Sequence, residues 1–154
     1  MKKILMVCTA NICRSPMAKL VLQKIVADAA QSSLWQIDSA GTHALAKGER
    51  ADPRADTALK RRGYTVLKHK SRSIQPMDFE NFDFLLAMDS NNLAALQRQC
   101  PARHQHKLRL LLDYAPQFGI SDVPDPYYSN AQGFERVLDL CESGTKGLFD
   151  QLSG

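Results

Sequence analysis

The sequence contains no long apolar run. Its longest apolar segments, residues 4–7 and 108–112, are far shorter than the roughly 20 residues that a membrane-spanning helix needs, and Arg109 interrupts the second. Lys2 and Lys3 lead directly into a segment of strand length, which does not match the layered pattern of a secretory signal. We therefore expect a cytoplasmic protein with no membrane partner.

Cysteine is scarce, and its spacing excludes the commonest structural zinc sites. The four cysteines are Cys8, Cys13, Cys100 and Cys141, and no C-x-x-C pair occurs among them. A chain of 154 residues can bury a full core without disulfides, and a reducing compartment would keep the thiols free. His104 and His106 have no acidic or cysteine residue beside them. We expect neither a metal ion nor another cofactor.

Neither sign of charge dominates the composition. The chain has 20 Lys and Arg against 16 Asp and Glu, which gives a formal net charge of +4. Aromatic residues are not interleaved with the basic segments 60–62, 68–72 and 103–109. These segments are typical of solvated surface, and we expect no nucleic-acid partner.

Strand-like and helix-like segments alternate along the chain. Apolar runs predict four strands, at residues 3–8, 34–38, 82–88 and 108–112. Apolar residues at helical spacing predict four helices, at residues 16–30, 53–62, 92–99 and 134–152. This alternation indicates an α/β fold, a four-stranded parallel sheet with helices on both faces, in one domain over residues 1–154. Binding sites in such sheets lie at the carboxyl ends of the strands.

The segment VCTANICRSP, residues 7–16, joins the first predicted strand to the first helix. A wrap of this kind points successive backbone N–H groups at an anion bound at the helix N-terminus. The planar fork of Arg14 can bind two phosphate oxygens, and the positive potential favours the thiolate form of Cys8. Ser15 can donate its hydroxyl to the sulfur. The glycine-rich Walker pattern is missing. The segment therefore predicts a phosphate-binding loop with a cysteine nucleophile.

Two motifs resemble those of the low-molecular-weight protein tyrosine phosphatases: VCTANICRSPMA and DPYY, residues 125–128. Between them IDSAGT, ADPRA, HKSR and FDFLLAMD follow the order and spacing of that family. The resemblance implies hydrolysis of phosphotyrosine in proteins, and of small aryl phosphates, through a cysteinyl-phosphate intermediate. It implies a tyrosine-phosphorylated protein as substrate and inorganic phosphate as product.

The resemblance also assigns roles to individual residues. Cys8 is implied as the nucleophile, Arg14 as the phosphate clamp and Asp125 as the general acid and base. The implied substrate-binding positions are Thr9, Ala10, Asn11, Ile12, Cys13, Ser15, Leu45, Tyr127 and Tyr128. Asn11 is implied to hold the loop in an unusual backbone conformation through bonds towards Ser39 and His69. Ala10 and Leu45 differ from the family, which commonly has glycine and an aromatic residue there.

The resemblance also implies an aromatic wall formed by Tyr127 and Tyr128, and placement along the chain agrees with the acid that it implies. Asp125 lies in a loop after the last predicted strand, so it reaches the same sheet edge as Cys8, and one carboxyl can both give and take the proton. Asp122 is the nearby alternative, but it lacks the following Pro-Tyr-Tyr. An apolar slot between Ile12 and the tyrosine rings suits a flat phenyl phosphate and disfavours phosphoserine.

Three other functions are weighed against this one. Arsenate reductases of the same fold need two further cysteines on a nearby segment, and residues 70–99 contain none. Protein-arginine phosphatases resemble the sequence but have threonine at the position of Ile12. A non-catalytic phosphate-binding module would keep Arg14 and discard Cys8 or Asp125, and both are present.

Two residues keep alternative interpretations. Cys13 is interpreted as a redox partner that forms a reversible disulfide with Cys8, since a curled loop can bring the two Cα atoms within the roughly 7 Å that a bridge requires; otherwise it packs behind the loop. Asp89 supports the phosphate-binding loop or caps the following helix.

Overall fold

The computed structural model describes residues 1–153 and contains a sheet of four parallel strands in the order β2-β1-β3-β4. The strands are β1 Lys2–Cys8, β2 Trp35–Gly41, β3 Phe84–Ala87 and β4 Leu108–Leu110. In β1, Ile4 pairs with Ile37 of β2 on one side and with Phe84 of β3 on the other. The parallel α/β fold predicted from the sequence is therefore confirmed.

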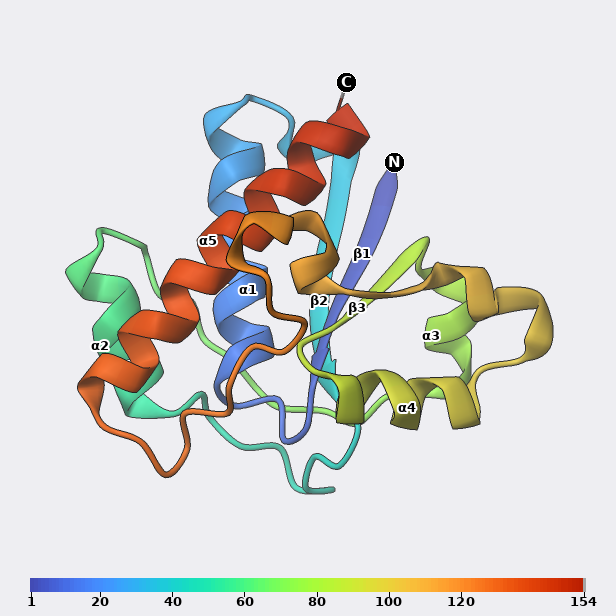
Figure 1. The fold of residues 1–154 in the computed structure, drawn as a ribbon, viewed down its shortest axis with the longest axis horizontal. Coiled ribbons are helices and arrows are strands. Elements are labelled where there is room, and N and C mark those ends of the chain that lie inside the picture. Colours follow the sequence, from blue (N-terminus) through green and yellow to red (C-terminus); the bar gives the residue numbers. More distant parts are fainter. Residues whose placement is uncertain (154) are drawn as a thin grey trace.

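Helices cover both faces of this sheet (Figure 1). The α-helices are α1 Arg14–Asp28, α2 Pro53–Arg61, α3 Pro76–Asn81, α4 Ser90–Gln99 and α5 Ala131–Ser153. Short 3-10 helices are η1 Ser32–Leu34, η2 Ala102–Lys107, η3 Leu111–Tyr114 and η4 Pro116–Phe118. Helices α1, α2 and α5 lie on one side of the strands, and α3 and α4 on the other.

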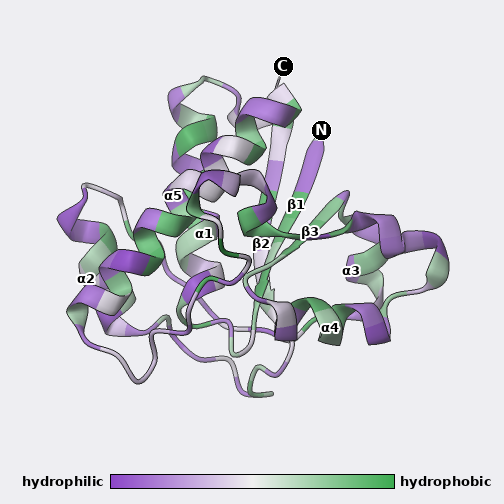
Figure 2. Ribbon diagram, viewed as in Figure 1, coloured by the Kyte–Doolittle hydropathy of each residue, from purple (hydrophilic) through white to green (hydrophobic). Residues whose placement is uncertain are grey.

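The central strand β1 shows why the core has two halves. Ile4 and Met6 belong to the cluster formed with α1 and α5, whereas Leu5 and Val7 belong to the cluster formed with α3 and α4. Successive side chains of a strand point to opposite faces, so a strand that is covered on both sides must be apolar throughout. Figure 2 shows hydrophobic residues along β1 and β3 between the two helix layers.

The boundaries of several elements differ from the predictions. The apolar run at 108–112 is a strand only to Leu110, because η3 begins at Leu111, and an apolar run alone does not distinguish strand from helix. Strand β2 continues to Gly41, beyond the predicted end at residue 38. The predicted third strand was too long, since Phe82 is the C-cap of α3 and only residues 84–87 form β3.

Helix boundaries were also partly wrong. Helix α1 begins at Arg14, two residues before Pro16, since the first turn of a helix has no N–H bonds for proline to break. Helix α3 was not predicted at all: six residues are too few to show an apolar stripe, although Pro76 at its first position marks the start. No helix among residues 1–153 is long and apolar enough to cross a membrane.

Candidate active site

The phosphate loop, residues 8–15, runs from the carboxyl end of β1 into α1. Three of its carbonyl groups accept hydrogen bonds from the segment 42–52, in the pairs Thr42 N to Cys8 O (2.9 Å), His43 N to Thr9 O (2.8 Å) and Asp52 N to Ile12 O (2.8 Å). The backbone N–H groups of residues 10–13 donate to no acceptor within residues 1–153. Since backbone donors in folded proteins are normally paired, this row of N–H groups is suited to an anion.

Asn11 fixes the shape of the phosphate loop. Its φ of 60° lies in the left-handed region, which asparagine tolerates better than most residues. Its Nδ2 donates to Ser15 Oγ (2.8 Å) and Ser39 Oγ (2.9 Å), and its Oδ1 accepts from the Arg72 N–H (3.1 Å). Its carbonyl oxygen lies 2.7 Å from Nε2 of His69. The structure thus brings together Asn11, Ser39 and His69, as the resemblance implies.

Gly41 allows β2 to approach the loop closely. A Cβ atom at Gly41 would lie 2.5 Å from the Thr9 carbonyl oxygen, so no side chain fits there. The sequence analysis did not identify this residue as part of the site, although a glycine in a strand is a signal of close backbone approach. Ala10, by contrast, does not have a positive φ, so its methyl group causes no backbone strain of that kind.

Cys8 is buried at the base of the loop. Its Sγ lies 2.9 Å from Ser15 Oγ, and either atom could donate the hydrogen. Because Asn11 Nδ2 already donates to the same Ser15 oxygen, the serine hydrogen is free to point at the sulfur. The Ser15 hydroxyl is therefore placed to donate to the Cys8 sulfur.

Hydrogen bonds to Asp89 and Val123 fix the guanidinium group of Arg14. Its Nη1 donates to Asp89 Oδ2 (2.6 Å) and to the Val123 carbonyl oxygen (2.9 Å), whereas its Nη2 has only long contacts, 3.4 Å to Thr9 Oγ1 and 3.7 Å to Asp125 Oδ2. Burial alone would lower the pKa of Arg14, but the hydrogen bond to Asp89 and the negative potential of Cys8 outweigh it, and the pKa is raised. Arg14 therefore stays charged beside the thiol.

Asp89 carries out both of the roles weighed for it. Its Oδ1 accepts from the Asn92 N–H (2.7 Å) at the start of α4, and its Oδ2 binds Arg14. Asn92 Nδ2 in turn donates to Thr9 Oγ1 (3.0 Å). The N-terminus of α4 is therefore joined to the phosphate loop.

The acid loop, residues 119–130, lies beside the phosphate loop. Asp125 Oδ2 lies 3.7 Å from Arg14 Nη2, and Asp125 Oδ1 accepts from the Tyr127 N–H (3.1 Å). The Asp125 side chain is 54% exposed, so water can reach it. Asp122, the alternative acid, instead accepts hydrogen bonds from Ser90 N and Oγ at 2.9 and 2.7 Å.

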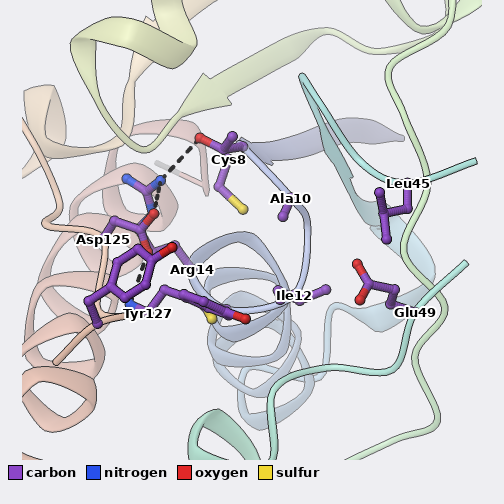
Figure 3. A pocket seen from close by; sticks show the side chains of 11 residues that line it. Cys8, Ala10, Ile12, Arg14, Leu45, Glu49, Asp125 and Tyr127 are labelled. Carbon is purple, nitrogen blue, oxygen red and sulfur yellow. Dashed lines mark hydrogen bonds and ion pairs between the residues drawn. The ribbon is translucent and has the colours of Figure 1, made fainter. Parts of the chain in front are cut away.

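The two loops, together with Leu45 and Glu49 of the segment 42–52, line a pocket of about 360 Å³. Figure 3 shows Asp125 and Tyr127 on one side, Leu45 and Glu49 on the opposite side, and Ile12 between them. The predicted site residues that line the pocket are Cys8, Thr9, Ala10, Ile12, Cys13, Arg14, Leu45, Asp125, Tyr127 and Tyr128. The side chains of Asn11 and Ser15 are fully buried and support the loop, so any contact of Asn11 with substrate would come from its backbone N–H, and the predicted contacts of both residues stay predictions. Glu49 was not predicted.

Cys13 lies in the wall of the pocket as a free thiol. Its Sγ donates to Asp52 Oδ2 at 3.8 Å. Burial, together with the negative charges of Asp52 and Cys8, raises the pKa of Cys13 to about 12. Cys13 is therefore protonated at neutral pH. Its pairing with Cys8 stays a prediction.

Arg54 joins α2 to the acid loop, and the sequence analysis did not identify it. Its Nη2 donates to Asp52 Oδ2 and to the Tyr127 carbonyl oxygen, both at 2.8 Å, and its Nη1 donates to the Ser129 carbonyl oxygen at 3.3 Å. Its guanidinium carbon lies 4.6 Å from the centre of the Phe134 ring. Arg54 lies within the ADPRA segment of the family resemblance, but a basic residue after Asp-Pro does not by itself indicate such a role.

No metal centre stands out elsewhere. Residues 1–153 contain no group of three His, Cys, Asp or Glu residues placed to hold a metal ion. His104 Nε2 lies 2.9 Å from Oε2 of Glu80 in α3, on the face of the sheet opposite α1 (Figure 1).

Comparison with known proteins agrees with this geometry. A family model described as "Low molecular weight phosphotyrosine protein phosphatase" matches residues 3–154. A low molecular weight protein-tyrosine-phosphatase from Streptomyces coelicolor is 44% identical over 149 residues, which cover 95% of this chain and 90% of that protein.

Solved structures have the same fold over nearly the whole chain. A protein tyrosine phosphatase from Entamoeba histolytica has a TM-score of 0.95 at 37% identity and covers 99% of this chain and 97% of its own. The arginine phosphatase YwlE, in a cysteine-to-serine variant with a phosphorylated active-site serine, has a TM-score of 0.87 at 28% identity; the match covers 98% of this chain and 95% of that one. The chain therefore belongs to the low molecular weight phosphotyrosine protein phosphatase family.

Proposed function

We propose that this protein hydrolyses phosphotyrosine in proteins, and small aryl phosphates, through a cysteinyl-phosphate intermediate on Cys8. The observation that carries the proposal is the row of backbone N–H groups at residues 10–13, which have no acceptor within residues 1–153 and lie beside Cys8 and Arg14. These donors and the guanidinium stabilise the equatorial oxygens of a transferring phosphoryl group.

In the first step, the Cys8 thiolate attacks phosphorus in line with the leaving tyrosyl oxygen. The S–P bond forms as the P–O bond breaks, and Asp125 gives its proton to the leaving oxygen. The pocket supports this assignment because Asp125 and Cys8 both line it.

In the second step, water attacks the phosphorus of the cysteinyl phosphate. The Asp125 carboxylate takes a proton from the water, the S–P bond breaks, and inorganic phosphate leaves. The Ser15 hydroxyl, 2.9 Å from the sulfur, stabilises the departing thiolate. The phosphorylated active-site serine in the YwlE variant supports a covalent phosphoenzyme in proteins of this fold.

The shape of the pocket favours an aryl phosphate. Ile12, Leu45 and the two adjoining tyrosines line it with apolar surface. The rings of Tyr127 and Tyr128 meet edge to face, with centroids 5.0 Å apart. A flat phenyl ring can fill such a slot, whereas phosphoserine is too short to contact it.

A nucleophilic thiolate also requires reducing conditions, so we infer that the protein acts in the cytoplasm.

Arginine phosphatase activity is the second candidate, favoured by the structural likeness to YwlE. The aliphatic side chain of Ile12 weighs against it, since it offers no hydrogen bond to a guanidinium group. The more similar proteins described above are tyrosine phosphatases.

The test is a comparison of kcat/KM on peptides of one sequence that carry phosphotyrosine, phosphoarginine or phosphoserine. We expect the phosphotyrosine peptide to be hydrolysed fastest, and Cys8→Ser to lower kcat on the order of 10³-fold or more. Cys100→Ser, a cysteine on the other side of the sheet, is the matched control and should retain activity. Faster hydrolysis of phosphoarginine, or full activity in Cys8→Ser, would contradict the proposal.

A further inference from the structure

A carboxylate stands at the rim of a pocket that is otherwise built for an anion. Glu49 lines the pocket on the side opposite Asp125 and Tyr127 (Figure 3). Neither step of the proposed reaction uses it, and its negative charge repels a phosphate group. Glu49 is therefore suited to bind a part of the ligand other than the phosphate group.

The backbone at Glu49 is held firmly. Its N–H donates to Ser71 Oγ and its carbonyl oxygen accepts from the Ser71 N–H, both at 2.8 Å, and Ser71 is buried. The preceding Gly48 packs against Lys70 so closely that a Cβ atom there would lie 2.3 Å from Lys70 Cγ. The carboxylate is thus carried by a fixed segment at the pocket rim.

The Glu49 carboxylate has no partner within residues 1–153. No Lys, Arg or His nitrogen of that range lies within 4.0 Å of it, and none of its hydrogen bonds involves the side chain. The exposed residues Lys47, Arg50 and Lys70 are its basic neighbours in sequence or packing, yet none of them pairs with it. Asp52 and Asp89, by contrast, are both bound by arginine. The free carboxylate is therefore available to a cation that arrives with the substrate.

We propose that Glu49 is a specificity-determining residue that pairs with a lysine or arginine side chain next to the phosphotyrosine of a protein substrate. The inference rests on the proposed function. With the phosphate in the loop and the ring against Ile12 and Tyr127, the flanking peptide must leave the pocket over its rim, where Glu49 lies. A basic side chain there gains an ion pair that a neutral one lacks.

The test uses three phosphotyrosine peptides that differ only in the residues flanking the phosphotyrosine: lysine, alanine or glutamate. The readout is the ratio of kcat/KM for the lysine peptide to kcat/KM for the alanine peptide. Because both values come from the same protein, differences in overall activity between variants cancel in this ratio. At low salt we expect a ratio of about two to five for the wild type, the range of a partly exposed ion pair. Raising the salt should lower the ratio.

Variants then assign the preference to one residue. Glu49→Gln should bring the ratio to about one, and Glu49→Lys should reverse the preference towards the glutamate peptide. Asp150→Asn, which removes an exposed carboxylate of α5 paired with Lys146, is the matched control and should keep the wild-type ratio.

Three results would overturn the inference: no preference for the lysine peptide, a preference of the wild type for the glutamate peptide, or an unchanged ratio in Glu49→Gln. Failure to hydrolyse any of the three peptides would instead overturn the proposed function, and this inference with it. The two failures are therefore distinguishable.

Discussion

At the scale of single residues, Asp89 links the start of α4 to Arg14, the proposed phosphate clamp. One of its oxygens caps α4 and the other binds Nη1 of Arg14. With Nη1 held from behind by Asp89 and Val123, the orientation of the guanidinium is set before any ligand arrives. Such preorganisation lowers the barrier because nothing has to rearrange during the reaction.

Asp89→Asn separates the two roles. The amide oxygen can still cap α4, but the charge-assisted hydrogen bond to Arg14 is lost. We expect kcat/KM for para-nitrophenyl phosphate to fall about tenfold or more. Asp122→Asn weakens the contacts to Ser90 at the same helix end without touching Arg14, so it should change kcat/KM far less. Equal losses in the two variants would show that only the helix end matters.

His69 contributes a pH dependence of stability. Burial lowers the pKa of His69, although the hydrogen bond to the Asn11 carbonyl acts in the opposite direction. In the unfolded chain His69 is protonated near pH 6.5, whereas in the folded protein it is protonated only at a lower pH. Between these two pH values the unfolded state binds more protons, so the free energy of unfolding must decrease as the pH falls.

His69→Gln removes this titration and keeps a donor that can reach the Asn11 carbonyl. Urea unfolding measured between pH 7.5 and 5 should show a smaller decrease in the free energy of unfolding for the variant than for the wild type. The difference should develop as the pH falls below about 6.5, the ordinary pKa of histidine. The exposed His106, changed to Gln, is the control and should follow the wild type. Parallel curves for wild type and His69→Gln would contradict the assignment.

At the scale of elements, Arg54 determines how the acid loop sits against α2. It binds the Tyr127 and Ser129 carbonyl groups of the acid loop and the Asp52 side chain that caps α2. Asp52 is also joined to the phosphate loop through its N–H bond to Ile12. We therefore expect Arg54 to position Asp125.

Arg54→Met should weaken this connection and displace Asp125. We expect the rate for phenyl phosphate, a poor leaving group that needs a proton, to fall several-fold more than the rate for para-nitrophenyl phosphate. The exposed Arg61 of the same helix, changed to Met, is the control. Equal losses on both substrates would mean that Arg54 stabilises the fold without positioning the acid.

Element boundaries show what local sequence could predict. The buried run of β1 and the capped start of α2 were predicted well, because apolar continuity and an Asp-Pro start are local signals. The end of β4 at Leu110 was not, since strand and 3-10 helix share the same apolar pattern there. Helix α3 is too short for periodicity to reveal.

At the scale of the whole molecule, the parallel sheet brings distant segments to one edge. The phosphate loop follows β1, Asp89 follows β3, and Asp125 comes after β4, so all three meet at the carboxyl ends of the strands. This meeting could be predicted from the alternation of strands and helices. The strand order and the pairs between distant residues, such as Arg54 with Tyr127, could not, because packing decides them and no local pattern encodes them.

The central claim is that Cys8 carries the phosphoryl group during turnover, and trapping that group tests it most directly. The protein is mixed with excess para-nitrophenyl phosphate, denatured within milliseconds, and its peptides are mapped by mass spectrometry. We predict one phosphoryl group, located on Cys8, in a larger fraction of the Asp125→Ala protein, because loss of the base slows hydrolysis of the intermediate. Turnover without a phosphorylated protein, or a phosphoryl group on any residue other than Cys8, would contradict the account.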